Sequence, residues 1–103
     1  MAKNILNKMR PIHPGEILKG ELETIGLSAN ALALKLHVPP NRITAILNEQ
    51  RGISPETAIR LARFFGTAPE FWLNLQRDFD LKTTQNKLGK QIDYDVEPYA
   101  DVA

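Results

Sequence analysis

Apolar residues recur through residues 14–81 at the three- and four-residue spacing of amphipathic helices. Proline and glycine divide this pattern into short segments, and Gly26 and Gly66 stand where helices are expected to end. The five predicted helices begin near Pro14, Ser28, Pro40, Ser54 and Thr67. The sequence therefore predicts an all-α fold, a compact bundle of five short helices joined by tight turns.

The last of these helices has a predicted start and an uncertain end. Thr67 and Glu70 have the spacing of a capping box at its start, and the helix is expected to fray between residues 82 and 87. Further on, residues 92, 94 and 96 are apolar and alternate with acidic residues, which indicates either a short strand or a disordered acidic terminus. We therefore predict an N-terminal arm over residues 1–12, a helical domain over 13–82 and a C-terminal extension over 83–103.

Length and composition narrow the class of protein. The chain has 103 residues, 43% of them hydrophobic and 24% charged, as expected of one folded domain. It contains no cysteine, which excludes disulfides, thiolate metal ligands and a cysteine nucleophile. No apolar run approaches the roughly 20 residues of a membrane-spanning helix, and the first ten residues lack the apolar stretch of a signal peptide. We expect a soluble cytoplasmic protein with no membrane partner.

The net charge of +1 is unevenly distributed. Residues 1–63 carry nine Lys and Arg against five Asp and Glu, whereas residues 64–103 carry four against seven. A mildly basic front half and an acidic rear half indicate different partners for the two ends of the chain.

The second and third predicted helices have the layout of a helix-turn-helix. Ala33 supplies the small residue that is needed where the two helices cross, and Ile43 and Ile46 supply the buried stripe of the second one. The opposite face of that second helix is polar. In a helix-turn-helix protein this face lies in the major groove of DNA, whereas in an ordinary helical hairpin it is only a solvated surface.

Side chains on that face have the chemistry of base recognition, because Arg donates two hydrogen bonds to guanine, Asn pairs with adenine, and Thr or Ala contacts a thymine methyl. The candidate base-reading residues are Pro40, Asn41, Arg42, Thr44, Ala45 and Asn48. Free N–H groups at the start of the helix before it are placed to hold a phosphate. The candidate phosphate contacts are Ser28, Asn30, Lys35 and Arg51.

Several sequence blocks carry a family resemblance. They include HPGEIL at 13–18, GLS at 26–28, RGISPETA at 51–58 and PEFWLNLQ at 69–76. On these blocks, about two thirds of the chain resembles the HigA/VapI family of antitoxins, a branch of the phage-repressor-like helix-turn-helix proteins. The resemblance implies a lambda-repressor-like fold and a homodimer that binds operator DNA and represses its own operon. It also implies a cognate HigB-type toxin, an mRNA endonuclease, as the partner that the protein neutralises.

The chain departs from this family pattern at three positions. His37 and Glu49 stand where relatives have glycine, and Ala29 stands where many have glutamine. A left-handed turn at His37 would cost about 1 kcal/mol or more. The departures bear on the details of operator contact more than on the fold.

The apolar face of the fifth predicted helix is a candidate dimer interface. An aromatic stripe at helical spacing is more often core or interface than a platform for single-stranded nucleic acid. The candidate interface residues are Trp72, Leu73, Leu75 and Phe79, together with the C-terminal extension. As an alternative, the alternating residues 92–96 would add a strand to the sheet edge of a partner.

No catalytic or metal-binding constellation is evident. His13 and Glu16 would need further ligands to hold a metal, and the paired Asp residues at 78–80 and 93–95 are better explained as solvated surface. We expect no metal, no cofactor and no enzymatic activity. Three functions remain: an antitoxin that is also an autorepressor, a stand-alone phage-type transcriptional regulator, and a protein-interaction module that never binds DNA.

Overall fold

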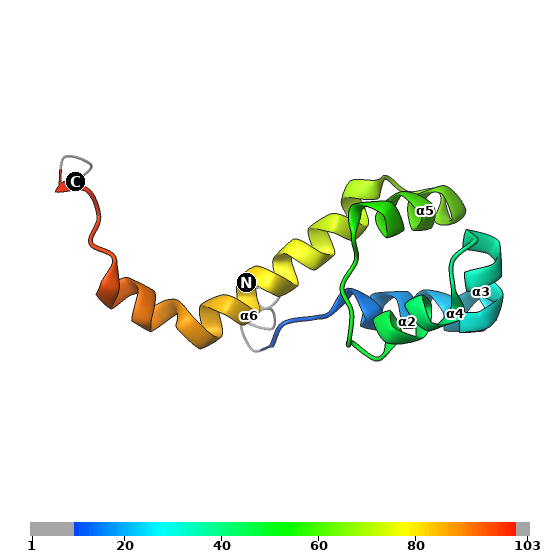
Figure 1. The fold of residues 1–103 in the computed structure, drawn as a ribbon, viewed down its shortest axis with the longest axis horizontal. Helices are drawn as coiled ribbons and strands as arrows, with labels where there is room; N and C mark the ends of the chain where they lie inside the picture. The colour runs from blue at the N-terminus through cyan, green and yellow to red at the C-terminus, as the bar shows by residue number, and fades with distance from the viewer. Residues whose placement is uncertain (1–9, 101–103) are drawn as a thin grey trace.

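The computed structural model describes residues 10–100 and has five helices and no strand within them (Figure 1). The helices are α2 (Pro14–Ile25), α3 (Ala29–Leu36), α4 (Pro40–Leu47), α5 (Pro55–Phe65) and α6 (Pro69–Asp95). Helices α2 to α5 pack together with the start of α6, and the rest of α6 projects away from them (Figure 1). The predicted all-α, five-helix fold is confirmed, but the described part of the chain is elongated, at 54 × 28 × 23 Å.

Capping residues set most of the helix boundaries. His13, Ser28 and Ser54 each accept a hydrogen bond from a backbone N–H in the first turn of α2, α3 and α5. Gly26 and Gly66 end α2 and α5 in the left-handed conformation that glycine adopts without strain. The predicted starts of these three helices, and the predicted ends of α2 and α5 at glycine, are confirmed.

The start of α6 differs from the predicted capping box. Its N-cap is Ala68, which makes no side-chain cap, and the helix begins at Pro69. The hydroxyl of Thr67 instead accepts a hydrogen bond from the indole Nε1 of Trp72, at 3.1 Å. The predicted pairing of Thr67 with Glu70 is wrong, because the buried indole N–H needs an acceptor and Thr67 supplies it.

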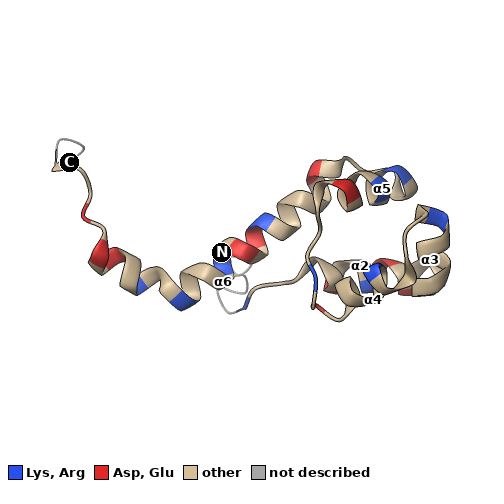
Figure 2. Ribbon diagram, viewed as in Figure 1, with Lys and Arg blue, Asp and Glu red and all other residues tan. Residues whose placement is uncertain are grey.

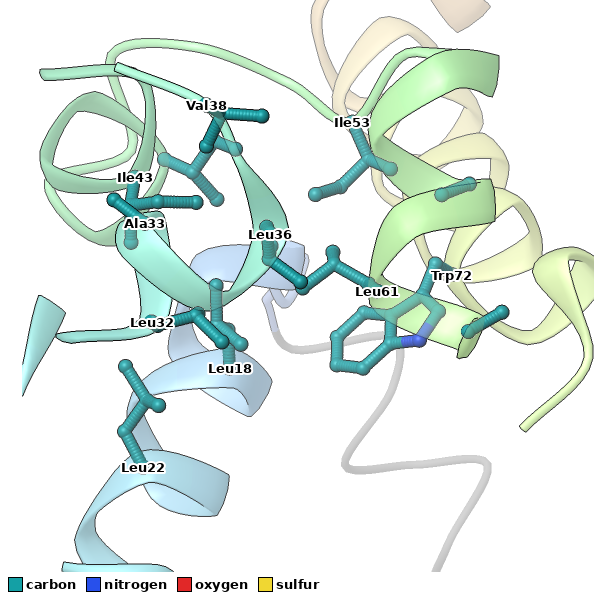
Figure 3. Packing of buried hydrophobic residues seen from close by; sticks show 13 residues of the cluster. Leu18, Leu22, Leu32, Ala33, Leu36, Val38, Ile43, Ile53, Leu61 and Trp72 are labelled. Carbon is teal, nitrogen blue, oxygen red and sulfur yellow. The ribbon is translucent and has the colours of Figure 1, made fainter. Parts of the chain in front are cut away.

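The core lies between α2, α3, α4, α5 and the first turn of α6 (Figure 3). The side chains that are at most 1% exposed are Leu18, Leu32, Ala33, Ile43, Ile46, Ala58, Leu61 and Trp72, with Thr57 beside them. Figure 3 shows Ala33 next to Ile43, at the crossing of α3 and α4. The small residue predicted at that crossing therefore allows the two helices of the helix-turn-helix to approach closely.

The second half of α6 corrects the prediction for the C-terminus. The helix continues without interruption to Asp95, through the segment expected to fray and through the predicted boundary at residue 82. Ile92 and Tyr94 lie within it, so they are not part of a strand. Lys, Gln and Leu are good helix formers, and a Gln91–Asp95 hydrogen bond of 2.8 Å joins successive turns. Local propensity thus extends this helix where burial does not require it. None of the described helices is both long and apolar enough to cross a membrane.

Two residues that flank α4 adopt left-handed backbone conformations. His37 has a φ of 59° and Glu49 a φ of 62°. Both side chains are exposed. A residue with a Cβ is strained by roughly 1–2 kcal/mol in this conformation, so the turns before and after α4 are held by the packing around them.

We expect Glu49→Gly to raise the free energy of unfolding by about 0.5–1 kcal/mol, because relief of the Cβ strain exceeds the extra chain entropy that glycine loses on folding. Chemical denaturation measures the change. Glu21→Gly, an exposed position inside α2, is the matched control and should lower stability by about 1 kcal/mol. Equal destabilisation by both substitutions would show that residue 49 is not strained.

Candidate nucleic-acid interface

Helix α4 presents one polar face to solvent. Asn41, Thr44 and Asn48 are exposed and Ala45 is half-buried, whereas the side chains on the opposite face are fully buried. Positions 41, 44, 45 and 48 follow the i, i+3, i+4, i+7 spacing that places residues on one side of a helix. Pro40 is exposed at the start of the same face. The structure therefore brings five of the six candidate base-reading residues together.

Arg42, the sixth candidate, lies differently. Its side chain is only 19% exposed, and its Nη1 lies 3.4 Å from the carboxylate of Glu56 on α5. Its Nε is buried and has no hydrogen-bond partner. The guanidinium therefore faces α5 in this conformation, and it is not a free pair of donors on the outer face of α4.

Glu56 is the centre of a small charge network. Its second carboxylate oxygen accepts a hydrogen bond from Arg60 Nε at 3.1 Å. Arg60 in turn donates from Nη1 to the backbone carbonyl of Leu36, at 2.9 Å. This network joins α4 to α5 and to the C-terminal end of α3.

A glycine in α2 fixes α4 from the other side. A Cβ on Gly15 would overlap the backbone carbonyl of Ile46, so only glycine permits this close approach. The backbone N–H of Gly15 donates to Nδ1 of His13 at 2.8 Å, and the buried His13 ring packs edge-on against Phe79. The segment at 13–15 thus forms the helix start predicted for it, and it also packs against the C-terminal end of α4.

Residues just before that segment are also fastened to α2. The Arg10 guanidinium donates two hydrogen bonds to the Glu16 carboxylate in a bidentate arrangement, at 2.9 and 3.0 Å. This contact lowers the pKa of the Glu16 carboxyl and raises that of the Arg10 guanidinium. Glu16 is therefore paired with arginine, and no group of three or more metal-ligating side chains occurs among residues 10–100.

Gln76 on α6 holds the loop that follows α4. Its Oε1 accepts a hydrogen bond from the backbone N–H of Ile53 at 2.7 Å, and its Nε2 donates to Asp80 at 3.0 Å. A Cβ on Gly52 would overlap this amide. The sequence analysis did not predict this role. The position of Gln76 on the apolar side of its helix is the feature that could have indicated a buried polar contact.

The candidate phosphate contacts lie at three separate places on the domain. Ser28 and Asn30 are exposed at the N-terminus of α3, where the Ser28 Oγ accepts from Ala31 N at 3.1 Å. Arg51 is exposed in the loop after α4. Lys35 lies at the other end of α3, where it lines a groove with α5.

Charge accumulates around these elements. Residues 28–63 hold five Lys and Arg against two Glu. Figure 2 shows basic residues on α3, α4 and α5 and both acidic and basic residues along α6. Helix α6 holds five Asp and Glu against four Lys and Arg, so the excess of positive charge lies on residues 28–63 and not on the projecting helix.

The candidate dimer-interface residues also differ among themselves. Trp72 is 1% exposed, so its side chain belongs to the core of its own protomer and is not available at a surface. Leu73, Leu75 and Phe79 are half-buried. Leu75 and Phe79 line an apolar groove of about 450 Å³ between α2 and α6. Further along α6, Leu81, Leu88 and Ile92 are each about half exposed and share one face of the projecting helix.

Comparison with known proteins agrees with this architecture. A helix-turn-helix family model matches residues 18–72. The chain is 55% identical to virulence-associated protein I of Dichelobacter nodosus over 80 aligned residues. The aligned region covers 77% of this chain and 74% of that protein. It is 39% identical to antitoxin HigA-1 of Vibrio cholerae over 88 aligned residues, and this aligned region covers 84% of this chain and 83% of that protein.

Solved structures give the same family. An addiction module antidote protein of the HigA family from Coxiella burnetii is 58% identical, with a TM-score of 0.86 over 87% of this chain and 99% of that one. The Pseudomonas aeruginosa antitoxin HigA, solved with the higBA promoter, is 49% identical, with a TM-score of 0.84 over 86% and 98% of the two chains. The resemblance found in the sequence blocks is confirmed, and the chain belongs to the HigA antitoxin family of helix-turn-helix proteins.

Proposed function

We propose that this protein is an antitoxin that binds a HigB-type mRNA endonuclease toxin and neutralises it, and that it represses its own operon by binding operator DNA as a homodimer. The observation that carries the DNA-binding part is the polar face of α4, which is exposed on a domain 49% identical to an antitoxin solved with its promoter. The toxin-binding part is supported by membership of the family.

In this proposal α4 lies in the major groove. Asn41, Thr44 and Asn48 contact base edges, and Pro40 and Ala45 pack against the groove. Ser28 and Asn30, at the start of α3, and Arg51, in the following loop, contact phosphates on either side of α4. Phosphate contacts fix the register, whereas the α4 side chains distinguish sequences.

Arg42 has a positioning role in this proposal. Its ion pair with Glu56 is mostly shielded from solvent on the Arg42 side, and it holds α4 against α5. Reading of a guanine by Arg42 would require the guanidinium to leave Glu56. We therefore assign base recognition to the exposed stripe of α4 and place Arg42 behind it.

The homodimer in this proposal forms along α6. Leu75, Phe79 and Leu81 line the groove beside α2, and Leu88 and Ile92 lie on the same face as Leu81 further along the projecting helix. Exposed leucine and isoleucine at this spacing are typical of helices that pack against a partner helix. A two-fold dimer would present two α4 helices to half-sites about one helical turn apart.

We expect Asn41→Ala and Thr44→Ala each to reduce the preference for operator over random DNA by about 1–3 kcal/mol, because each removes a contact to a base edge. Arg51→Ala should weaken binding to both DNAs equally, because phosphates are the same in every sequence. Fluorescence anisotropy with labelled duplexes measures both affinities. An equal loss on both DNAs for the two α4 variants would contradict the base-reading role.

The same assay tests the positioning of α4. Glu56→Gln removes a negative charge near the DNA-binding face, so electrostatics alone would strengthen DNA binding. If Glu56 orients Arg42 and α4, operator affinity falls instead while the affinity for random DNA does not. A tighter complex with both DNAs would show that the network does not position α4.

We expect Leu88→Asp to dissociate the dimer, because it places a charge in the apolar stripe of α6. Light scattering on a size-exclusion column measures the mass of the eluting species. Asn86→Asp adds the same charge on another side of the helix and should leave the dimer intact. Identical masses for the two variants would place the dimer interface elsewhere.

The antitoxin function is tested by isolating the tagged protein from its own cells after nuclease treatment. We expect a small basic protein to remain bound, because the contact with a toxin is independent of DNA. An excess of the purified protein alone should restore translation in an extract that the released partner inhibits. Recovery of DNA when nuclease is omitted, with no protein partner in either sample, would favour a stand-alone transcriptional regulator.

A further inference from the structure

We propose that Gln76 on α6 is a positioning residue for DNA binding, whose side-chain amide holds the loop at 51–53 so that Arg51 contacts a phosphate. This role rests on the phosphate contact of Arg51 described under the proposed function. It deepens that function, because a part of the DNA affinity then depends on a residue that does not itself touch DNA.

The loop between α4 and α5 is fastened at two points, and Arg51 lies between them. On the α4 side, the backbone N–H of Gln50 donates to the carbonyl of Ala45 at 2.9 Å. On the α6 side, the backbone N–H of Ile53 donates to Oε1 of Gln76 at 2.7 Å. Arg51 therefore lies on a bridge of two residues whose ends are both fixed.

Gln76 also packs directly against this bridge. A Cβ on Gly52 would lie 2.7 Å from Oε1, 2.9 Å from Cδ and 3.0 Å from Nε2 of the Gln76 amide, so only glycine permits this close approach. The next side chain, Ile53, is buried in the core (Figure 3). The loop thus meets the amide through a hydrogen bond and through packing, and its position depends on both.

Asp80 orients the amide. Nε2 of Gln76 donates to the Asp80 carboxylate at 3.0 Å, one helical turn further along α6. An amide has a donor end and an acceptor end, and rotation by half a turn exchanges them. Only one of these two orientations satisfies both the Asp80 carboxylate and the Ile53 N–H. Asp80 therefore keeps Oε1 directed at the loop.

Arg51 is free to bind an anion. Its side chain is exposed, and it has no ion-pair partner among residues 10–100. A contact costs less conformational entropy when the segment that carries it is already ordered before binding. Loss of the Gln76 anchor would therefore weaken the phosphate contact although Arg51 itself is unchanged.

Salt dependence distinguishes this role from a purely structural one. A hydrogen bond that only stabilises the fold changes the fraction of folded protein, and the contacts of the folded protein with DNA stay the same. A positioning contact changes the number of phosphates that the folded protein neutralises. That number sets the slope of the logarithm of the binding constant against the logarithm of the salt concentration.

Fluorescence anisotropy at several salt concentrations measures this slope for operator and random duplexes. Arg51→Ala should reduce its magnitude by about 0.9, the value of one phosphate contact. Gln76→Leu changes no charge, but it should reduce the slope by at least half as much and weaken binding to both DNAs severalfold. Asn74→Leu, at an exposed position on the same helix, is the control and should change neither quantity.

A double-mutant cycle tests the link between the two residues. In the Gln76→Leu background, Arg51→Ala should lose much less affinity than in the wild-type protein, because the contact is already weakened. Light scattering measures the mass of each variant, and circular dichroism measures its fold.

A second pair of variants exchanges the donor and the acceptor. Gln76→Glu places a second carboxylate beside Asp80 and should reduce the slope. Adding Asp80→Asn supplies an amide donor for the new glutamate and restores the wild-type net charge, so it should restore the slope. If Gln76→Leu does not fold, the comparison of Gln76→Glu with this exchanged pair decides the result.

The outcomes separate this role from the proposed function. Wild-type slopes in the Gln76 variants, with a reduced slope for Arg51→Ala, overturn the positioning role and leave DNA binding intact. Additive losses from Gln76→Leu and Arg51→Ala, or a changed mass for Gln76→Leu, make Gln76 structural and also overturn it. A wild-type slope for Arg51→Ala overturns both the positioning role and the phosphate contact. Failure of the wild-type protein to bind any duplex overturns the proposed DNA-binding function itself.

Discussion

The orientation of α4 depends on the burial of Ile43 and Ile46, both 0% exposed, against the helices behind it. The helix has only eight residues, and a helix of that length is not stable alone in water. Its tertiary contacts therefore determine both that it forms and where it points. The exposed polar stripe has a defined direction only because the opposite face is completely buried.

Three further contacts restrict the same helix from different sides. The backbone of Gly15 meets the carbonyl of Ile46, Arg42 pairs with Glu56 on α5, and Gln76 on α6 holds the N–H of Ile53 in the following loop. Each comes from a different element of the chain. The recognition surface proposed for α4 would have to be held to within a fraction of an ångström to distinguish bases, and these contacts restrict the helix in the way that role requires.

The parts of the structure that depend on local sequence were predictable. Ser28, Ser54 and the helix-ending glycines fixed boundaries, and the three- and four-residue spacing identified which side of each helix is buried. The partner of Arg42 was not predictable, because periodicity places a residue on a face but does not identify a neighbour 14 positions away. The continuation of α6 was also missed. There the helix extends beyond the core, so the polar run at residues 83–86 is not evidence against it.

The molecule separates two kinds of surface. Residues 28–63 carry an excess of positive charge, whereas α6 has a nearly balanced set of acidic and basic residues and an apolar stripe (Figure 2). The excess of positive charge thus lies on the side of the molecule that is proposed to approach DNA, where it would favour binding. This arrangement also leaves the apolar stripe of α6 available for the proposed dimer, in which both α4 helices would remain exposed.

The most direct test of this account is selection of binding sites from random duplexes by the full-length protein. A dimer that reads DNA through α4 should enrich an inverted repeat whose half-sites are centred about 10 base pairs apart, or a multiple of that spacing. Enrichment of no sequence, or of a single half-site without its inverted copy, would contradict the account.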